Sequence, residues 1–506
     1  MLQHIYSWGE EHKLRFNPNK TRGIVFNRPR QANLYRRPPH LKMNGKIIKV
    51  KETLKYLGVN LDFRLSWDKH VEHITNRTGL ILQSYAQVAK NNWGLTSNAM
   101  SIIYDGIYLP IMTYACGTWG WATRKVHTNR KLISSQRRAL ILIAKAFRTV
   151  SNRCLQVIAR KPPIDLAILQ RQKYQLIKWG ENIQTTTSTI HHDDIEWPIP
   201  FRESLPPNES TTDIDNTSES SNINIFTDGS RINNSVGCSF VIYNNNTEIS
   251  QQTFRLDDRC TVFQAELFAI GKAIDYVNQT YENVAVDIYT DSLSAYNLIK
   301  SNKLHPLAVK VKNLIKKSKC NIYISWVRAH QGLKGNERAD TLAKYATTKD
   351  SNNTEYNKIS QQTLRQLLWK DTLLQWQTTW DHDMQHITHR FIPDLKKFIS
   401  IDWYTPDYCT TQIFTKHGKF ANYLVRFTNR TSGLCPTCNV EDGPEHYIYD
   451  CTAFERERNE LRILIEEQGI EWPSSPSDIW LNREIYNNFK QFAKQNYYVN
   501  KTKIYS

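Results

Sequence analysis

The sequence predicts an α/β domain over residues 221–348, an α-rich basic region before it and a small helical tail after it. Within 221–348, short alternating runs of β-branched and aromatic residues give way to apolar residues at helical spacing, a pattern typical of strands and helices. Two polar stretches, 185–222 and 347–357, separate this segment from its neighbours. The first region contains helical stretches such as LISSQRRALILIAKAFRTVS, which indicates an α-rich domain.

The elements of the central segment are expected in the order strand, strand, strand, helix, strand, helix, strand, helix. INIF followed by Thr-Asp-Gly-Ser predicts a strand and a turn, with Asp228 at the strand end. SVGCSFVIYN and EISQQTFRL predict the next two strands, and VAVDIYTDS predicts another that ends at Asp291. Apolar residues over 262–277 recur at helical spacing and place Glu266 on the core-facing stripe. The last helix carries Asp340.

Four acidic residues in these contexts predict a metal site. Each is expected to be buried or to end an element, where an unpaired carboxylate is costly unless something binds it; they are Asp228, Glu266, Asp291 and Asp340. Carboxylate oxygens suit Mg²⁺ or Mn²⁺ rather than zinc. Two such ions about 4 Å apart activate water and stabilise the leaving oxygen in phosphodiester hydrolysis. The alternative for Glu266 alone is a boundary residue whose carboxylate reaches solvent.

The motifs that carry these acids resemble the ribonuclease H family. TDGS, AEL, TDS and SWVRAHQGLKGNERAD occur in the order and at the intervals of that family. The resemblance implies a mixed five-stranded sheet with flanking helices. It also implies an enzyme that cuts the RNA strand of an RNA–DNA hybrid and leaves a 3′ hydroxyl and a 5′ phosphate.

The same resemblance assigns roles to the site residues. It implies that the four carboxylates hold two Mg²⁺ or Mn²⁺ ions and that His330 assists proton transfer or product release. The alternative for His330 is a solvent-exposed loop histidine. Selectivity for RNA requires contacts to the 2′-hydroxyl. Ser230, Asn297 and Gln264 are candidates for these contacts by position.

A second set of possible ligands lies near the end of the chain. Cys435, Cys438, His446 and Cys451 form the pattern C-x2-C-x7-H-x4-C. Thiolate and imidazole ligands in this number and spacing can close one tetrahedral zinc site. The alternative is four incidental residues. The basic and aromatic residues of 415–427 precede this pattern, and they suit either contact with nucleic acid or the packing of an amphipathic helix.

Composition favours a polyanionic partner and a reducing compartment. The net charge of +18 and the pI near 9.3 suit nucleic acid, either an RNA–DNA hybrid or single-stranded RNA. The alternatives for a basic surface are solubility alone and contact with an acidic membrane. Protein partners cannot be named from the sequence. No apolar run reaches membrane length. Nine cysteines without a signal-peptide pattern favour reduced residues in an intracellular protein, nuclear or cytoplasmic.

The polar stretches define four segments. Residues 1–184 form the basic α-rich region, 185–220 a disordered linker, 221–348 the α/β domain and 358–506 the helical tail. The first region resembles the end of a non-LTR retrotransposon reverse transcriptase, on the residues Trp8, Lys55-Tyr56-Leu57-Gly58-Val59, Trp67, His70, Tyr114 and Trp119. The order of the three regions is similar to the C-terminal part of Jockey-like and I-like polyproteins. That resemblance implies a thumb-like nucleic-acid clamp attached to a nuclease.

One feature of that family is missing from its expected place. The polymerase uses a paired aspartate on a hairpin, and neither of the available pairs, Asp193-Asp194 and Asp257-Asp258, has an apolar strand leading into it at the right place. DNA synthesis by this chain alone is therefore not expected. The sequence predicts a metal-dependent ribonuclease H. The alternatives are a nucleic-acid-binding protein with an inactive ribonuclease H fold and a structural relic that neither binds nor cuts.

Overall fold

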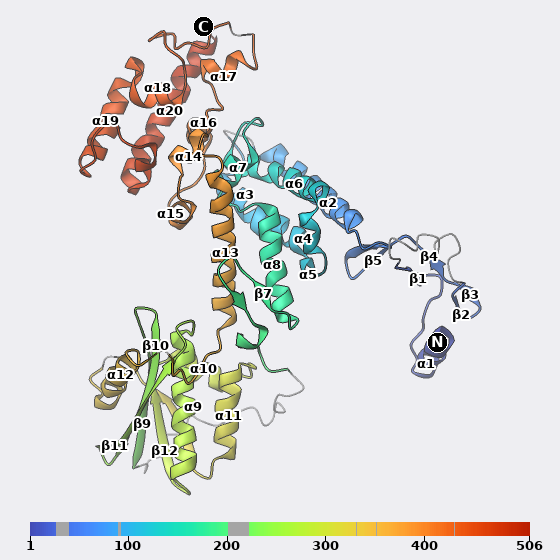
Figure 1. Ribbon diagram of the computed structural model, residues 1–506, viewed down its shortest axis with the longest axis vertical. Coiled ribbons are helices and arrows are strands. Elements are labelled where there is room, and N and C mark those ends of the chain that lie inside the picture. The colour runs from blue at the N-terminus through green and yellow to red at the C-terminus, as the bar shows by residue number, and fades with distance from the viewer. Residues whose placement is uncertain are drawn as a thin grey trace. The chain divides into compact units, whose positions relative to one another are not determined.

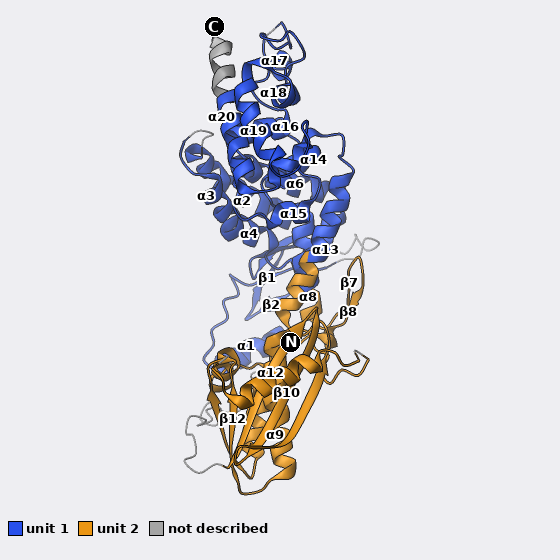
Figure 2. Cartoon of the chain, turned by 90° about the vertical axis from the view of Figure 1, so that its left-hand side faces the viewer, with its two compact units in different colours: residues 1–175, 370–506 blue, residues 176–369 orange. Residues whose placement is uncertain are grey.

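The computed structural model describes residues 1–26, 40–89, 93–200, 222–329, 331–350, 352–429 and 431–505. The chain divides into two compact units (Figure 2). Unit 1 contains residues 1–175 and 370–506, and unit 2 contains residues 176–369. None of the described helices is long and apolar enough to cross a membrane.

Unit 2 is built around a five-stranded mixed sheet (Figure 1). Its strand order is β11-β10-β9-β12-β13, where β9, β10 and β11 are antiparallel neighbours and β9, β12 and β13 run parallel. The strands are β9 (Ile223–Ile232), β10 (Ser235–Asn244), β11 (Thr247–Leu256), β12 (Ala285–Thr290) and β13 (Asn321–Trp326). The helices are α9 (Val262–Thr280), α10 (Leu293–Lys300), α11 (Pro306–Lys317) and α12 (Lys334–Ala346). The predicted α/β fold with flanking helices is confirmed.

Alternating side chains on the strands make two apolar faces, and helices cover both. Ile225, Phe240 and Ile242 belong to the larger core, together with residues of α9, α10 and α11. On the opposite face, Val241 packs with residues of α12 and with Phe226. A strand places successive side chains on opposite faces, so residues one apart in β9 or β10 reach different helices. This arrangement buries the sheet on both sides.

Residues 185–200 differ from the predicted disordered linker. They continue a short hairpin and turn formed by β7 (Ile183–Gln184), β8 (Thr189–Ile190) and the 3₁₀ helix η4 (His192–Asp194). Ile195 then forms a β-bridge with Ile359, and Glu196 is buried beside Tyr356, whose hydroxyl donates a 2.5 Å hydrogen bond to its carboxylate. Residues 201–220 of the predicted linker lie outside the described residues.

Unit 1 is mostly helical, and the described residues near its beginning form three two-stranded sheets. The strands are β1 (Arg22–Gly23), β2 (Lys42–Met43), β3 (Lys46–Ile47), β4 (Lys49–Val50), β5 (Thr53–Tyr56) and β6 (Val59–Asp62). The helical elements before unit 2 are α1 (Leu2–Glu11), α2 (Asp68–Val88), α3 (Ser97–Ile103), η2 (Tyr104–Tyr108), α4 (Leu109–Thr113), α5 (Cys116–Trp119), η3 (Gly120–Arg124), α6 (Val126–Ala144), α7 (Asn152–Ile158) and α8 (Ile164–Lys178), which continues into unit 2.

The remaining helical elements come after the sheet domain. They are α13 (Gln361–Asp381), which begins in unit 2, α14 (Ile387–Phe391), α15 (Leu395–Ser400), α16 (Tyr408–Thr415), α17 (Ala421–Val425), α18 (Pro444–Tyr449), η7 (Thr452–Phe454), α19 (Glu455–Glu466), η8 (Pro476–Trp480) and α20 (Arg483–Tyr505). Helical regions therefore flank the sheet domain on both sides in the sequence, as predicted.

The two helical regions share one core, whereas the sequence analysis treats them as separate segments. One apolar cluster contains buried residues from both. Polar contacts also join them: the Thr411 hydroxyl donates to the Ala144 carbonyl at 2.7 Å, and the Arg160 guanidinium donates to the Ile399 carbonyl at 2.6 Å. Regions that are more than 200 residues apart in the sequence thus fold as one unit.

Candidate active site and Cys3His cluster

Strand register brings Asp228 and Asp291 together. The parallel pairing of β9 with β12 ends at Thr227 opposite Thr290; Asp228 is the next residue of β9, and Asp291 directly follows the end of β12. Asp228 does not lie at a strand end as predicted, because β9 continues its antiparallel pairing with β10 as far as Ile232. Beyond Thr227, β9 stays paired with β10 but is no longer paired with β12. The two carboxylates therefore meet at that edge.

Helix α9 adds Glu266 to this edge. The helix starts in a capping box, in which the Thr261 hydroxyl accepts from the Gln264 backbone N–H and the Gln264 side chain accepts from the Thr261 backbone N–H. Gly229 lets the helix approach the strand, since a Cβ there would lie 2.7 Å from the Glu266 backbone nitrogen. Glu266 is only 6% exposed, so its carboxylate does not reach solvent as a boundary residue would.

Helix α12 approaches the same edge from the other face of the sheet. The Asn336 amide donates to the Asp291 carboxylate at 3.1 Å. Ser239, which pairs with Asp228 in the sheet, donates its hydroxyl to the Ala339 carbonyl at 2.7 Å. These contacts hold the helix with Asp340 beside the strand that carries Asp228.

The structure brings three of the four predicted carboxylates into one group. Asp228, Glu266 and Asp291 each offer an oxygen within 4.8 Å of the others. Asp340 is not part of that group, and its carboxylate accepts a 2.7 Å ion-pair hydrogen bond from Lys344 one turn later. Its charge nevertheless acts on Asp228, as the pKa of that residue shows.

The carboxylates repel one another strongly. Burial, followed by the charges of Asp291 and Asp340, raises the pKa of Asp228 to about 8, against the smaller opposing effects of the Gly229 backbone N–H and Lys344. Burial, followed by the charges of Asp228 and Asp291, raises the pKa of Glu266 well above its ordinary value. A site that crowds acids in this way binds protons or cations with high affinity.

The donor set fits a divalent cation. The Glu266 Oε2 atom is buried and has no hydrogen-bond partner in the part of the chain that the structure describes. An orphaned carboxylate oxygen is costly unless a cation completes it. Every ligand atom in the group is a carboxylate oxygen, the type that Mg²⁺ and Mn²⁺ prefer.

The remaining predicted site residues have different outcomes. Gln264 is fully buried, and its amide donates to Glu196 at 2.9 Å and to the Lys358 carbonyl, so its predicted contact with a 2′-hydroxyl is wrong. Ser230 is half-buried and Asn297 is exposed, and their contacts with a 2′-hydroxyl stay predictions. His330 lies outside the described residues, and its predicted role stays a prediction.

Neither paired aspartate resembles a polymerase centre. Asp193 and Asp194 lie in the 3₁₀ helix η4. Asp257 and Asp258 follow β11 and bind arginines: Asp257 accepts from Arg259 at 2.9 Å.

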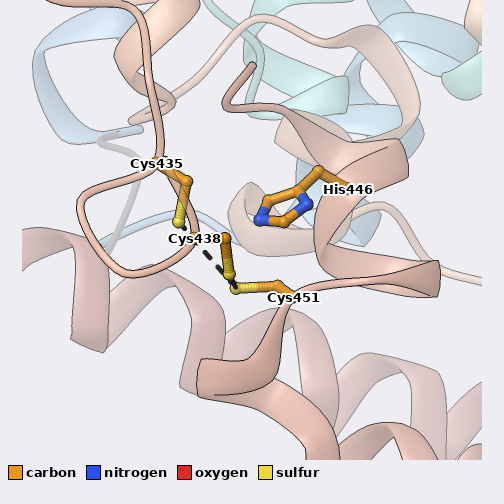
Figure 3. A group of neighbouring side chains, drawn as sticks. All are labelled: Cys435, Cys438, His446 and Cys451. Carbon is orange, nitrogen blue, oxygen red and sulfur yellow. Dashed lines mark hydrogen bonds between the residues drawn. The ribbon is translucent and has the colours of Figure 1, made fainter. Parts of the chain in front are cut away.

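The Cys3His pattern folds into one cluster, in which the four side chains point toward a common centre (Figure 3). The ligand atoms of Cys435, Cys438, His446 and Cys451 all lie within 4.8 Å of one another. The Cys451 sulfur is 4.0 Å from that of Cys435 and 3.8 Å from that of Cys438. A tetrahedron with Zn–S bonds of about 2.3 Å has sulfur atoms about 3.8 Å apart, so these separations fit zinc.

Local backbone contacts shape the cluster. The Cys435 N–H donates to the Val440 carbonyl at 2.7 Å, and the Asn439 N–H donates back to the Cys435 carbonyl at 2.8 Å. Asn439 has a positive φ of 54°, which closes this tight loop. The Cys451 N–H donates to the His446 carbonyl at 2.8 Å and fixes the second half of the cluster.

The chemistry of the cluster also fits a cation. The His446 Nε2 atom is buried and has no hydrogen-bond partner among the described residues. The Thr452 hydroxyl and backbone N–H lower the pKa of Cys438 to about 6, which favours its thiolate. Burial raises the pKa of Cys451 to about 12. No cysteine in the described chain forms a disulfide, so the thiols are available as ligands.

Comparison with known proteins gives this geometry a family. Residues 220–348 match the family model described as RNase H. This segment belongs to the ribonuclease H family. The N-terminal ribonuclease H domain of a Mycobacterium tuberculosis protein, solved as a fusion with maltose-binding protein, is 21% identical and covers 25% of this chain and 94% of that chain, with a TM-score of 0.22.

Relatives with longer matches come from retrotransposons. A putative 115 kDa protein of the type-1 element R1DM from Drosophila melanogaster is 30% identical over 142 residues, which are 28% of this chain and 14% of that protein. A Pol polyprotein of an R1 element from Nasonia vitripennis is 27% identical over 198 residues, 36% of this chain and 50% of that protein. The chain thus matches half or less of these two relatives.

The predicted resemblance to non-LTR retrotransposon polyproteins is confirmed. R1 and jockey elements both appear among the relatives, and the match lies in their C-terminal region. A ribonuclease H domain in this context supports a nuclease of the ribonuclease H type.

Two residues that shape the site had no role in the sequence analysis. Asn336 orients Asp291, and Lys344 pairs with Asp340. Lys344 follows Asp340 by four residues, a spacing that places both on one helix face and could have been recognised. The contact of Asn336 depends on how α12 packs across the sheet, which no local pattern encodes.

Proposed function

We propose that residues 220–348 form a divalent-metal-dependent endoribonuclease that cleaves the RNA strand of RNA–DNA hybrids. The observation that carries this proposal is the group of three carboxylates within 4.8 Å, with one buried glutamate oxygen lacking a partner. The match of this segment to the ribonuclease H family supports the substrate class.

The position of each residue in the site suggests its role in the proposed reaction. Asp228, Glu266 and Asp291 hold the cations, and the Asn336 amide orients Asp291 through its 3.1 Å hydrogen bond. Bound Mg²⁺ or Mn²⁺ supplies an activated water and stabilises charge on the leaving oxygen. Asp340 completes the negative potential beside Asp228, with Lys344 holding its carboxylate. His330 assists proton transfer or product release.

We further propose that Cys435, Cys438, His446 and Cys451 hold one structural zinc ion. All four positions of a tetrahedral site are filled by side chains, so none is open for a substrate. The ion would stabilise the loop and helix that carry the ligands, as closed zinc sites do in small folds.

A cleavage assay tests the nuclease. The full chain is incubated with an RNA–DNA hybrid labelled on the RNA strand, with and without Mg²⁺, beside Asp228→Asn and a duplex-DNA control. Cleavage of the RNA strand that requires both Mg²⁺ and Asp228 supports the proposal. A folded protein that binds the hybrid without cutting it would instead be a nucleic-acid-binding protein with an inactive fold.

A further inference from the structure

The basic and aromatic segment 415–427 admits two interpretations from sequence, and the structure separates its residues between them. Phe420 and Ala421 are buried in the core of unit 1. Tyr423 is half-buried, whereas Phe427 is 57% exposed. Packing therefore uses only part of the segment and leaves the Phe427 ring on the surface, 4.8 Å from the ring of Tyr423.

These two rings line a cleft together with positive side chains. The cleft has a volume of about 420 Å³ and lies between α14, α16, α17 and the start of α18; its lining includes His386, Arg390, Lys416, Tyr423, Arg426 and Phe427. Thr149 fixes one wall, since its hydroxyl lies 2.7 Å from both His417 Nδ1 and the Tyr423 hydroxyl.

The cleft is positively charged, and its existing ion pairs are weak. Glu445 is its only acidic lining residue in the described chain; it pairs with Arg390 and lies 3.7 Å from the Lys416 Nζ atom. Arg426 has no acidic partner among the described residues. Both partners of these pairs are solvent-exposed, and exposed ion pairs contribute little to stability, so an incoming phosphate can replace them.

The effect of this charge is visible at His417. Burial, followed by the positive charges of Arg426 and His386, lowers the pKa of His417. The charge of Arg426 therefore extends to His417, which lines the same cleft.

A second cleft shares Arg390 with the first. Its volume is about 870 Å³, and its lining includes His389, Tyr449, the acidic Asp450, Trp472 and the serines of 474–477. The rings of Tyr449 and Trp472 lie 5.6 Å apart. Arg390 thus stands between two cavities, each of which contains a pair of aromatic rings.

We propose that these two clefts bind consecutive unpaired nucleotides of a single-stranded nucleic acid, with Arg390 on the phosphate that joins them. Aromatic rings accept the faces of bases, and arginine and lysine accept the backbone phosphates. The site lies outside the ribonuclease H unit and does not depend on its proposed activity.

The chemistry of the clefts favours single strands over two alternatives. A base pair hides the faces of its bases in the stack, so a duplex could use the cations but not the rings. An acidic peptide could likewise use the cations but offers nothing that requires four rings in pairs. The rings therefore decide between partners that the charges alone cannot separate.

Binding measurements on the full chain test this site. Fluorescence anisotropy with labelled U12, dT12 and a 12-base-pair DNA duplex, without Mg²⁺, compares wild type with Phe427→Leu and Arg390→Ala. Matched controls are Trp93→Ala, at a ring 65% exposed elsewhere in unit 1, and Arg456→Ala, at an arginine 88% exposed on α19. Circular dichroism verifies that each variant folds.

The proposal predicts a specific pattern. Phe427→Leu weakens single-strand binding by roughly 5- to 150-fold, which corresponds to loss of one stacked base, and Phe427→Trp restores it. Arg390→Ala lowers the slope of log K against log salt by about 0.7, the value for one phosphate on a single strand. Both controls bind like wild type. Preference for U12 or for dT12 identifies RNA or DNA as the strand, and either supports the site.

Three results would overturn the proposal. The first is wild-type affinity in both cleft variants. The second is an equal loss of single-strand and duplex binding in Phe427→Leu, which would make the clefts a general backbone surface. The third is displacement of U12 by polyglutamate as effective as displacement by unlabelled U12, which would indicate an acidic protein partner.

Discussion

The carboxylate group and the Cys3His cluster gather their ligands by opposite routes. The carboxylates come from two strands and a helix spread over residues 228–291, and the register of β9 with β12 brings them together. The Cys3His ligands come from residues 435–451 and are arranged by hydrogen bonds within that stretch. The first site therefore depends on the whole domain, whereas the second is local.

The two sites also differ in their electrostatics without a cation. Crowding raises the pKa of Asp228 to about 8, because burial and its acidic neighbours oppose its charge. In the other cluster, hydrogen bonds from Thr452 lower the pKa of Cys438 to about 6. Burial raises the pKa of Cys451 in the same cluster to about 12, so there only the Cys438 thiolate is favoured, whereas the charged forms of both Asp228 and Glu266 are disfavoured at the carboxylate group. Their responses to mutation should differ accordingly.

The largest effect is expected at the carboxylate group. Glu266→Gln should lower the rate of hybrid cleavage by about 10³-fold. Bound metal ions supply several kcal/mol of transition-state stabilisation, and a loss of about 1.36 kcal/mol slows a reaction tenfold. The measurement is the single-turnover rate of RNA-strand cleavage in Mg²⁺. Asp275→Asn, on the same helix and paired with Lys310 at 3.9 Å, is the matched control and should cleave at the wild-type rate. Equal losses in the two variants would contradict the assignment.

The spacing of apolar residues along the sequence was enough to predict the strands and the helix that carry the carboxylate group. The alternation of INIF and VAVDIYTDS predicted the two strands that lead to Asp228 and Asp291, and helical spacing placed Glu266 toward the core. The exact end of β9 was missed because pairing with β10 extends the strand past Asp228. Such pairing is a property of two strands, and neither sequence alone reveals where it stops.

Long-range contacts account for the other differences. The polar stretch 185–200 has few apolar residues, yet Ile195 and Glu196 anchor it to residues near the end of unit 2. The role of Gln264 as a helix cap was recognisable from Thr261 three residues earlier, but its buried partner Glu196 was not. The shared core of unit 1 depends on contacts between distant segments, which no local pattern predicts.

The second effect tests the local cluster. Cys438→Ser should remove about one zinc ion per chain, because a closed site loses its tetrahedral set with any ligand. Metal analysis of the purified full chain measures this. Cys409→Ser, at a half-buried cysteine of α16 outside the cluster, should retain the metal. Hybrid cleavage should persist in both variants, since the carboxylates are in the other unit. Equal zinc content in Cys438→Ser and wild type would refute the site.

The third effect sharpens the boundary of the carboxylate group. Asp340 lies outside the group of three and pairs with Lys344. Asp340→Asn should therefore lower cleavage by about 10- to 100-fold. This is the range for residues that support the metal ligands without binding the metal themselves. Rates measured across Mg²⁺ concentrations distinguish weaker metal binding from slower chemistry. A loss as large as that of Glu266→Gln would show that Asp340 joins the ligands when the cation binds.

The smallest effect concerns stability and carries the opposite sign to activity. The pKa of Asp228 is raised from 3.8 to about 8 in the folded chain, so the folded state holds a proton that the unfolded state releases, and stability falls as pH rises between these values. Asp228→Asn removes that charge and should stabilise the Mg²⁺-free domain by on the order of 1–2 kcal/mol at pH 8–9, with little gain near pH 4.

Hydrogen exchange of the β9 and β12 amides in the full chain, in Mg²⁺-free buffer, measures the difference. Added Mg²⁺ should then slow exchange in wild type more than in the variant, because only wild type keeps the full set of carboxylates that the cation neutralises. A variant less stable than wild type at pH 9 would show that Asp228 serves the fold rather than a cation.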